Sequence, residues 1–416
     1  MTYTINTAII KANLNYGKEP IVMRYSGVTA KGIITPIFKF GDDLIEGIVG
    51  SLLKTAENEK FDFNDGDIVG VTEALVARTQ GNYATCEQIA KDIERKFGGE
   101  ELGIVFPILS RNRFSILLKG ISMGTKKLYV QLSYPTDEVG NLLVDREVFD
   151  ETDINPYSDH FTEKEFRKIF DKNSTVHHFT GVDYIEFYKS INSNIEIIIS
   201  NDPTHILKYT KNVINCDVHT RKRTQKLLKK AGAEKSFRLD DILTEPVDGS
   251  GYNPEYGLLG SNKASEDSVK LFPRDTQAFV DALAAALKEK TGKNIEVLIF
   301  GDGGFKDPVG GIWELADPVI APAYTGGLVG TPNELKIKYF ADNDFAMLSG
   351  EELESALKEQ IKNKNKNLVG NMHAQGTTPR RIIDLVGSLC DLVSGSGDRG
   401  TPVVLVQGYF NNFASE

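Results

Sequence analysis

The strongest candidate for chemistry is an aspartate in a glycine-rich segment directly after an apolar run. The run IEVLIF (295–300) leads into GDGG (301–304), so Asp302 stands among three glycines. Glycine lets a ligand approach the backbone closely, and a carboxylate is a hard oxygen ligand that suits a divalent cation bridging phosphates. The alternative is a tight turn with a solvated side chain, because Asp-Gly pairs are common in turns.

Two further segments carry groups that can bind phosphate. The glycine-rich loop GSGDRG (395–400) can offer backbone N–H groups to an anion. It follows a predicted helix instead of opening one, so the helix dipole does not favour an anion there, and a connecting loop is the alternative. Arg78 follows the strand-like run IVGVT (68–72) and can contact phosphate or simply lie on the surface.

The chain also contains zinc-ligand residue types and one strongly basic stretch. The zinc-ligand types form two groups, His177, His178 and Asp183, and Cys216, Asp217 and His219. Neither group has the doubled spacing of a zinc site, so we do not expect zinc there. The stretch TRKRTQKLLKK (220–230) predicts an amphipathic helix with a solvated face, and binding of an acidic substrate is the alternative.

Composition indicates an ordinary globular protein with more than one domain. The chain has 416 residues, a net charge of -10 and three widely spaced cysteines. Its length predicts two or three domains, and its negative charge disfavours nonspecific binding to nucleic acid or to an anionic membrane. Because no cysteine pairing, leader or run of ~20 apolar residues is evident, we expect a soluble cytoplasmic protein without disulfides.

The elements that must position these residues follow from apolar periodicity and turn signals. Helices are predicted at 42–57, 86–98, 220–232, 276–292, the last with Asp275 as its cap, and 380–393. Strands are predicted at 33–38, 68–72, 109–121, 126–135, 194–202, 295–300 and 402–408. Acidic loops, aromatic residues and most of the histidines gather between about 146 and 255, which indicates an inserted subdomain.

Five segments together carry a resemblance to a known family. They are ITPIFKFGDDL (34–44), GDIVGVTEALVARTQG (66–81), GLLGSNKASEDSVKLFPRD (257–275), VLIFGDGG (297–304) and SGSGDRGTPVVLVQG (394–408). In their order and spacing the sequence resembles the coenzyme F420-0:L-glutamate ligases, which are γ-glutamyl ligases. The resemblance covers about 130 N-terminal and 160 C-terminal residues.

The resemblance implies an α+β fold of two intertwined mixed α/β domains, usually assembled as a homodimer. On this view residues 1–145 and 256–416 form the ligase-like segments, and 146–255 form the inserted subdomain. The implied enzyme adds L-glutamate to an acidic small-molecule acceptor, coenzyme F420-0 or similar, through an acyl phosphate. It uses GTP or ATP with Mg²⁺ or Mn²⁺. No Ser/His or Cys/His nucleophile is needed for such a reaction.

The resemblance also implies roles for individual residues. Catalytic roles fall to Asp302 and Arg78. The implied nucleotide-binding residues are Ile33, Ile34, Thr35, Pro36, Thr72, Glu73, Arg78, Asn262, Gly395, Ser396, Gly397, Asp398, Gly400 and Thr401. The implied metal ligands are Asp302 and, if the insertion has split the site, Asp137.

Three departures from the family pattern bear on this hypothesis. Leu259 stands where the family has its other metal-binding aspartate, Ser396 replaces a glutamate, and Gly303 replaces a threonine. The changes at Leu259 and Ser396 favour one alternative, a nucleotide- or metabolite-binding homologue without ligase chemistry. The retained Asp302, Arg78 and Asn262 favour the γ-glutamyl ligase, whose acceptor can also be another acid such as a folate. A third alternative is that the inserted subdomain makes the chain a partner-binding module.

Overall fold

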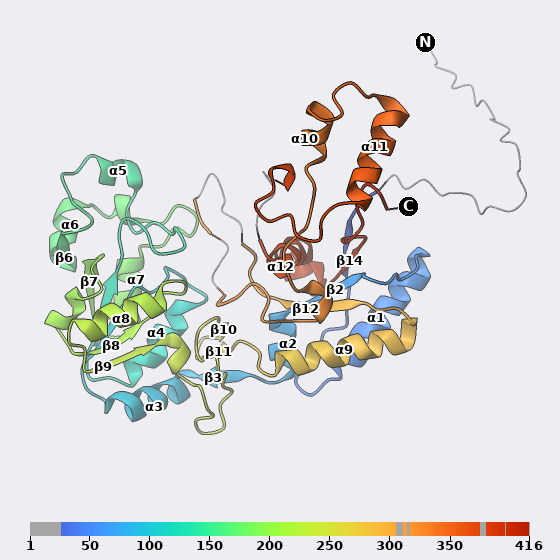
Figure 1. The fold of residues 1–416 in the computed structure, drawn as a ribbon. Helices are drawn as coiled ribbons and strands as arrows, with labels where there is room; N and C mark the ends of the chain where they lie inside the picture. Colours follow the sequence, from blue (N-terminus) through green and yellow to red (C-terminus); the bar gives the residue numbers. More distant parts are fainter. Residues whose placement is uncertain (1–25, 305–310, 314–316, 375–379, 396, 416) are drawn as a thin grey trace, which may run out of the picture. The chain divides into compact units, whose positions relative to one another are not determined.

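The computed structural model describes residues 26–304, 311–313, 317–374, 380–395 and 397–415 (Figure 1). Its contacts divide the chain into two compact units. The larger unit consists of Ala30–Pro332 and Pro379–Gln407, and the smaller unit of Met1–Thr29, Asn333–Thr378 and Gly408–Glu416. Every predicted site residue that the structure describes belongs to the larger unit.

The described residues contain both helices and strands throughout, which confirms the predicted α+β class. The helices are α1 (Leu44–Glu59), α2 (Glu73–Thr79), α3 (Cys86–Phe97), α4 (Phe114–Met123), α5 (Arg146–Asp150), α6 (Glu163–Ile169), α7 (Tyr184–Ile191), α8 (Arg221–Lys230), α9 (Thr276–Thr291), α10 (Ile337–Asp342), α11 (Gly350–Lys362) and α12 (Ile382–Ser394). The strands are β1 (Thr29–Ile33), β2 (Ile68–Thr72), β3 (Tyr83–Thr85), β4 (Leu102–Val105), β5 (Leu128–Leu132), β6 (His160–Thr162), β7 (Ile195–Ser200), β8 (Asn212–Asn215), β9 (Lys235–Arg238), β10 (Asn262–Ser265), β11 (Ser268–Lys270), β12 (Glu296–Phe300), β13 (Ala323–Tyr324) and β14 (Val403–Gln407).

One mixed sheet joins the two ends of the larger unit. Its strand order is β1-β14-β2-β12-β13, with β12 parallel and β14 antiparallel to β2. Strands from the N-terminal and C-terminal parts of the chain therefore alternate within one sheet. Apolar residues of α1 and α9 pack on this sheet, where Ile48 and Leu283 join Val69, Val71 and Ile299 in one buried cluster.

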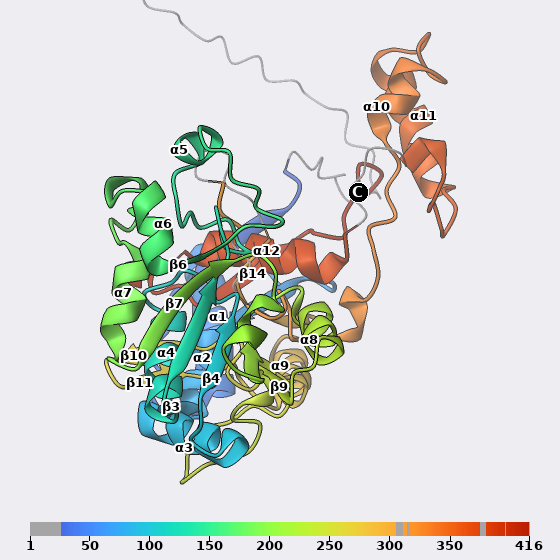
Figure 2. The ribbon, with the colours of Figure 1, turned by 90° about the vertical axis from the view of Figure 1, so that its left-hand side faces the viewer.

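A second, six-stranded sheet has the order β6-β7-β5-β4-β8-β9, and all its strands are parallel except β6. Numbered by their order in the chain, the five parallel strands lie across the sheet in the order 3-2-1-4-5. This is the doubly wound order of dinucleotide-binding folds. Alternate residues of one strand enter different clusters, Ile104 on the face covered by α4 and α7, and Val105 on the face covered by α8. Figure 2 shows α7 and α8 on opposite sides of this sheet.

The second sheet reaches beyond the predicted insertion. Strands β4 and β5 precede residue 145, whereas β7, β8 and β9 follow it, and all five pair in the one sheet. The predicted boundary between 145 and 146 thus falls inside this sheet. The division into 1–145, 146–255 and 256–416 stays a prediction.

Three local predictions were wrong. Residues 109–121 were expected as a strand but contain α4, because Phe114, Leu117, Leu118 and Ile121 have the spacing of one helical face. The strand predicted at 33–38 ends at Ile33 in the structure. Asp275 occupies the N-cap of α9, but its side chain makes no capping hydrogen bond there, and its φ is 54°.

The smaller unit is helical in its described part. Here α10 and α11 contact one another, and the ring of Phe340 lies 4.8 Å from that of His373 and 5.8 Å from that of Phe345. These rings form a small local core. None of the helices in the described ranges has the length and apolar character needed to cross a bilayer.

Close packing of β2 generates a prediction about stability. A Cβ atom at Gly70 would lie 2.6 Å from the sulfur of Cys390 on α12, whereas a Cβ atom at Gly50 on α1 would meet no atom within 4 Å. We expect Gly70→Ala to lower the free energy of unfolding by about 1–3 kcal/mol through overpacking. Gly50→Ala should raise it by about 0.5–1 kcal/mol because alanine favours a helix interior. Urea unfolding of both variants checks the pair, and equal effects would contradict the packing described here.

Candidate functional site

Asp302 lies just beyond the carboxyl end of β12, beside the carboxyl end of β2. The two strands are parallel, and their register pairs Phe300 with Thr72. Asp302 follows Phe300 by two residues, and Glu73 begins α2 immediately after Thr72. The sheet therefore brings together two of the segments in which site residues were predicted.

A buried arginine of the chain binds the side chain of Asp302. Arg113, at the N-cap position of α4, donates to Asp302 Oδ2 at 2.7 Å and to Asp317 Oδ1 at 2.8 Å. The other oxygen of Asp317 accepts from the backbone N–H of Asp302 at 2.8 Å. The exposed fraction of the side chain is 16% for Arg113 and 2% for Asp317. Burial opposes the charge of Arg113, but the two carboxylates outweigh it and raise the pKa of the guanidinium.

Further carboxylates surround this arginine. Asp391 of α12 accepts from the backbone N–H of Gly303 at 2.9 Å. Glu73 is buried and pairs with Lys270 of β11 at 2.7 Å. Burial raises the pKa of Glu73 and that of Asp391.

The negative charge around Asp302 is only partly compensated. Burial, followed by the charge of Asp317, raises the pKa of Asp302 to about 7, and Arg113 counteracts this rise. Asp391 and Glu73 add to the rise. A carboxyl group with such a pKa is half protonated near neutral pH, so an added cation beside it would be electrostatically favoured.

A cavity of about 420 Å³ lies where three predicted segments meet. Its lining combines the turn after β1, the start of α2 and the loop before β14: Thr35, Pro36, Ile37, Phe38, Thr72, Ala74, Leu75, Arg78, Ser394, Gly395, Arg399, Gly400, Thr401 and Pro402. Backbone hydrogen bonds hold the segments together, from Thr35 N to Gly400 O at 3.3 Å and from Thr72 N to Pro402 O at 3.0 Å.

Seven of the predicted nucleotide-binding residues line this cavity, namely Thr35, Pro36, Thr72, Arg78, Gly395, Gly400 and Thr401. Ile33 is buried in the core, Ile34 is 73% exposed, and Glu73 is held by Lys270. Asn262 lies in β10, and neither it, Gly397 nor Asp398 contributes to the lining. Ser396 lies outside the described residues.

Two arginines give the cavity a positive charge. Arg78 and Arg399 both line it and both have exposed side chains. Neither forms an ion pair with any residue in the described ranges. Two uncompensated guanidinium groups at a cavity with backbone N–H groups are suited to a polyphosphate.

The structure gives Asp137 a local structural role. Its two carboxylate oxygens accept four hydrogen bonds, from the backbone N–H groups of Leu109, Val139 and Asn141 and from the side-chain amide of Asn141, at 2.8 to 3.0 Å. Asp137 is 6% exposed, and burial raises its pKa to about 6. Its assignment as a metal ligand stays a prediction, and the four donors explain the geometry of this loop without a cation.

The zinc alternatives gain no support from the geometry. Among the described residues no three His, Cys, Asp or Glu side chains converge to hold a metal ion. Asp183 pairs instead with Arg167 at 2.7 Å. All three cysteines are buried and unpaired, and burial raises the pKa of Cys216 far above its ordinary value.

Several site residues were not predicted from the sequence. Arg113 was placed in an expected strand, yet the helical spacing of Phe114 and Leu117 could have located it at a helix start. Arg399 stood inside the predicted glycine-rich loop but was not chosen. Asp317 has no local signal, because only the fold brings it to Arg113.

Comparison with known proteins identifies the family of the chain. The model of the family described as F420-0:Gamma-glutamyl ligase matches residues 32–408, nearly the whole chain. No curated protein matches the sequence.

The raised pKa of Asp302 predicts a pH-dependent effect on stability. The ordinary carboxyl pKa is 3.8 and the folded-state pKa is about 7, so this group stabilises the fold at low pH and loses that contribution as pH rises through 7. Asp302→Asn removes the buried charge. We expect it to raise the thermal midpoint by ~2–4 °C at pH 8 and to give little or no gain at pH 5. Differential scanning calorimetry at both pH values measures this.

The matched control is Asp153→Asn, since Asp153 is an exposed aspartate. It should leave the midpoint unchanged at both pH values. A midpoint of Asp302→Asn below that of the wild type at pH 8 would show that loss of the Arg113 pair outweighs relief of the negative charge.

Proposed function

Because the chain belongs to the F420-0:gamma-glutamyl ligase family, we propose that it is a ligase that uses a nucleoside triphosphate to join L-glutamate to a carboxylate acceptor. Addition of glutamate is the activity of the family. The nucleotide, the acyl phosphate and the acceptor, coenzyme F420-0 or a similar acid, are the parts that we propose.

The observation that carries the proposal is the cavity of about 420 Å³ beside the end of β2. It joins segments from the two ends of the chain, and Arg78 and Arg399 give it positive charge. Thr72 lines the cavity and also pairs with Phe300 in the sheet. Asp302 follows Phe300 by two residues, so it lies near the same end of the cavity. Phosphates held by these arginines would therefore extend toward the carboxylates around Asp302.

The proposed reaction has two steps. An oxygen of the acceptor carboxylate attacks the γ-phosphorus, and the nucleoside diphosphate leaves. The amine of glutamate then attacks the acyl carbon and forms the C–N bond. The C–O bond to phosphate breaks, inorganic phosphate leaves with that oxygen and the electron pair, and the amine gives up a proton. The chain's own residues would orient the phosphates and neutralise their charge, which is the main source of catalysis in phosphoryl transfer.

A divalent cation fits the residues around Asp302 in part. Asp302 carries excess negative charge, and Asp391 lies close enough to raise its pKa. Leu259, where a second carboxylate would be expected, is buried and apolar. A cation bound here would take most of its ligands from phosphate and water, as Mg²⁺ commonly does, and it would neutralise phosphate charge. We therefore propose one metal, Mg²⁺ or Mn²⁺, with Asp302 as its protein ligand.

The same Leu259 favours a second candidate function, nucleotide binding without ligation. The two candidates differ in one measurement, glutamate-dependent release of phosphate in the presence of an acceptor. A homodimer, as the resemblance implies, stays a proposal and can be tested by light scattering.

Nucleotide binding is the first test. Isothermal titration calorimetry with GTP and with ATP, each with Mg²⁺, should show binding to the wild type. Arg78→Met and Arg399→Met should each weaken it about 10- to 100-fold, since a hydrogen bond to a charged group contributes about 1.5–3 kcal/mol.

Asp302→Asn should weaken binding of the metal-nucleotide more than that of the nucleotide alone. Binding should also strengthen from pH 6 to pH 8, because the metal needs the ionised carboxylate of Asp302.

The control is Arg223→Met, which changes an exposed arginine of α8 outside the cavity. It should bind nucleotide as the wild type does. Absence of binding by the wild type to either nucleotide would remove both candidate functions.

A further inference from the structure

We propose that the acceptor binds in a second cavity, at the carboxyl edge of the doubly wound sheet, with Arg111 as the group that recognises an acidic part of it. This inference rests on the proposed function and adds the position and chemical class of one substrate. The acceptor class is a carboxylic acid with an aromatic or apolar body.

The second cavity has a volume of about 570 Å³. This lies within the range of roughly 300–1,000 Å³ typical for pockets that hold drug-sized ligands. Its lining is mixed, with apolar side chains (Ile108, Leu109, Val139, Tyr184, Ile312, Trp313), polar side chains (Ser110, Asn112, Asn141, Thr180) and charged side chains (Arg111, Arg113, Lys263, Asp302). A free amino acid would leave much of this space empty, so we assign the cavity to the larger of the two acidic substrates.

The position of the cavity follows from the strand order. In a doubly wound sheet, ligands bind outside the carboxyl ends of the strands where the order reverses, which here is between β4 and β8. The segment that follows β4 (Ile108 to Arg113) supplies six of the lining residues. Tyr184 and Thr180, at and before the start of α7, come from the predicted insertion. The cavity thus combines segments that the resemblance covers with two side chains from the predicted insertion.

Asp302 belongs to the lining of this cavity, and Asp302 also lies beside the end of β2, where the first cavity begins. A molecule in the second cavity can therefore present a carboxylate toward phosphates held by Arg78 and Arg399. This is the arrangement that transfer of a phosphoryl group to that carboxylate requires.

The three cationic side chains of the second cavity differ in whether a carboxylate compensates their charge. Arg113 is already neutralised by Asp302 and Asp317. Lys263 pairs with Glu266, whose side chain is 82% exposed. Arg111 is exposed, forms no ion pair with any residue that the structure describes, and lines the cavity together with Tyr184. An uncompensated guanidinium in a cavity that also contains an aromatic ring suits an acidic ligand with an apolar body.

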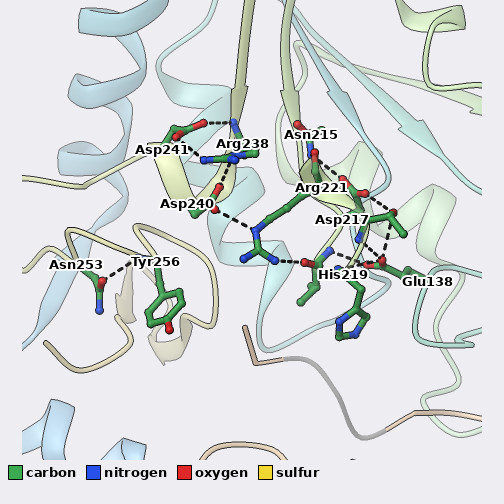
Figure 3. Close-up of polar contacts among 12 residues, drawn as sticks. Glu138, Asn215, Asp217, His219, Arg221, Arg238, Asp240, Asp241, Asn253 and Tyr256 are labelled. Atoms are coloured by element: carbon green, nitrogen blue, oxygen red, sulfur yellow. Dashed lines mark hydrogen bonds and ion pairs between the residues drawn. The ribbon is translucent and has the colours of Figure 1, made fainter. Parts of the chain in front are cut away.

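The wall of the cavity opposite α7 is fixed in place. Asp137 holds the loop that carries Val139 and Asn141 through four hydrogen bonds. The next residue, Glu138, accepts from the backbone N–H groups of Val218, His219 and Thr220 at 2.6 to 3.0 Å, just before α8 (Figure 3). These contacts hold the loop after β5 to the segment between β8 and α8.

Two variants test the assignment in different ways. Arg111→Gln removes the uncompensated charge, and Thr180→Phe fills part of the cavity. The probes are coenzyme F420-0 and folate, titrated by fluorescence in the presence of Mg²⁺ and a non-hydrolysable GTP analogue. We expect the wild type to bind at least one probe. Both variants should bind that probe at least tenfold more weakly, while their affinity for the nucleotide analogue is unchanged.

Arg223→Gln serves as the matched control for loss of one exposed arginine, and it should bind both ligands as the wild type does. Unchanged nucleotide affinity and thermal midpoint show that Thr180→Phe is folded. Equal probe affinity of wild type and both variants would overturn the proposal, as would failure of both probes to bind a wild type that binds nucleotide. Failure of the wild type to bind nucleotide would instead contradict the proposed function.

Discussion

The ion pairs of Arg113 with Asp302 and Asp317 are the interaction on which the site depends. They link the loop after β4 in one sheet to the exit of β12 in the other, and all three groups are largely withdrawn from water. Loss of the arginine from such a largely buried set commonly costs about 3–5 kcal/mol, because both carboxylates are left without compensation. The orientation of Asp302, and with it the rim shared by the second cavity and the end of β2, is therefore set by a contact between segments distant in sequence.

This contact also determines how the carboxylates around Asp302 are compensated. Arg113 compensates two carboxylates, Lys270 compensates Glu73, and Asp391 has only neutral donors such as the N–H of Gly303. Burial and the remaining negative charge raise the pKa of Asp302, a condition that costs stability in the isolated protein. A loss of stability of this kind is typical of residues that bind a ligand or take part in chemistry. At a purely structural position, a neutral side chain would avoid the loss.

The sequence allowed the elements nearest the site to be predicted where their patterns were local. The strand 68–72, the helix 276–292 and the run into Asp302 all have clear periodicity and turn residues, and the structure confirms them. The loop before β14 was recognised from its glycines. Prediction failed where a role depends on tertiary contact. Asp317 acquires its role from the fold alone, because only the fold brings it to Arg113. The role of Asp137 as a metal ligand stays a prediction, and its carboxylate accepts from three backbone N–H groups and from the side-chain amide of Asn141. The doubly wound order of the second sheet was also missed, because α4 was taken for a strand.

The alternation of strands in the mixed sheet has a consequence for how the chain reaches its native state during synthesis. β2 ends at Thr72, yet its two neighbours begin at Glu296 and Val403, so β2 emerges from the ribosome long before either can pair with it. The doubly wound sheet lies wholly between these points and can complete itself first. Folding would then proceed from the middle of the polypeptide outward, and the nucleotide-facing cavity would be the last part to form, since its loop precedes the final strand.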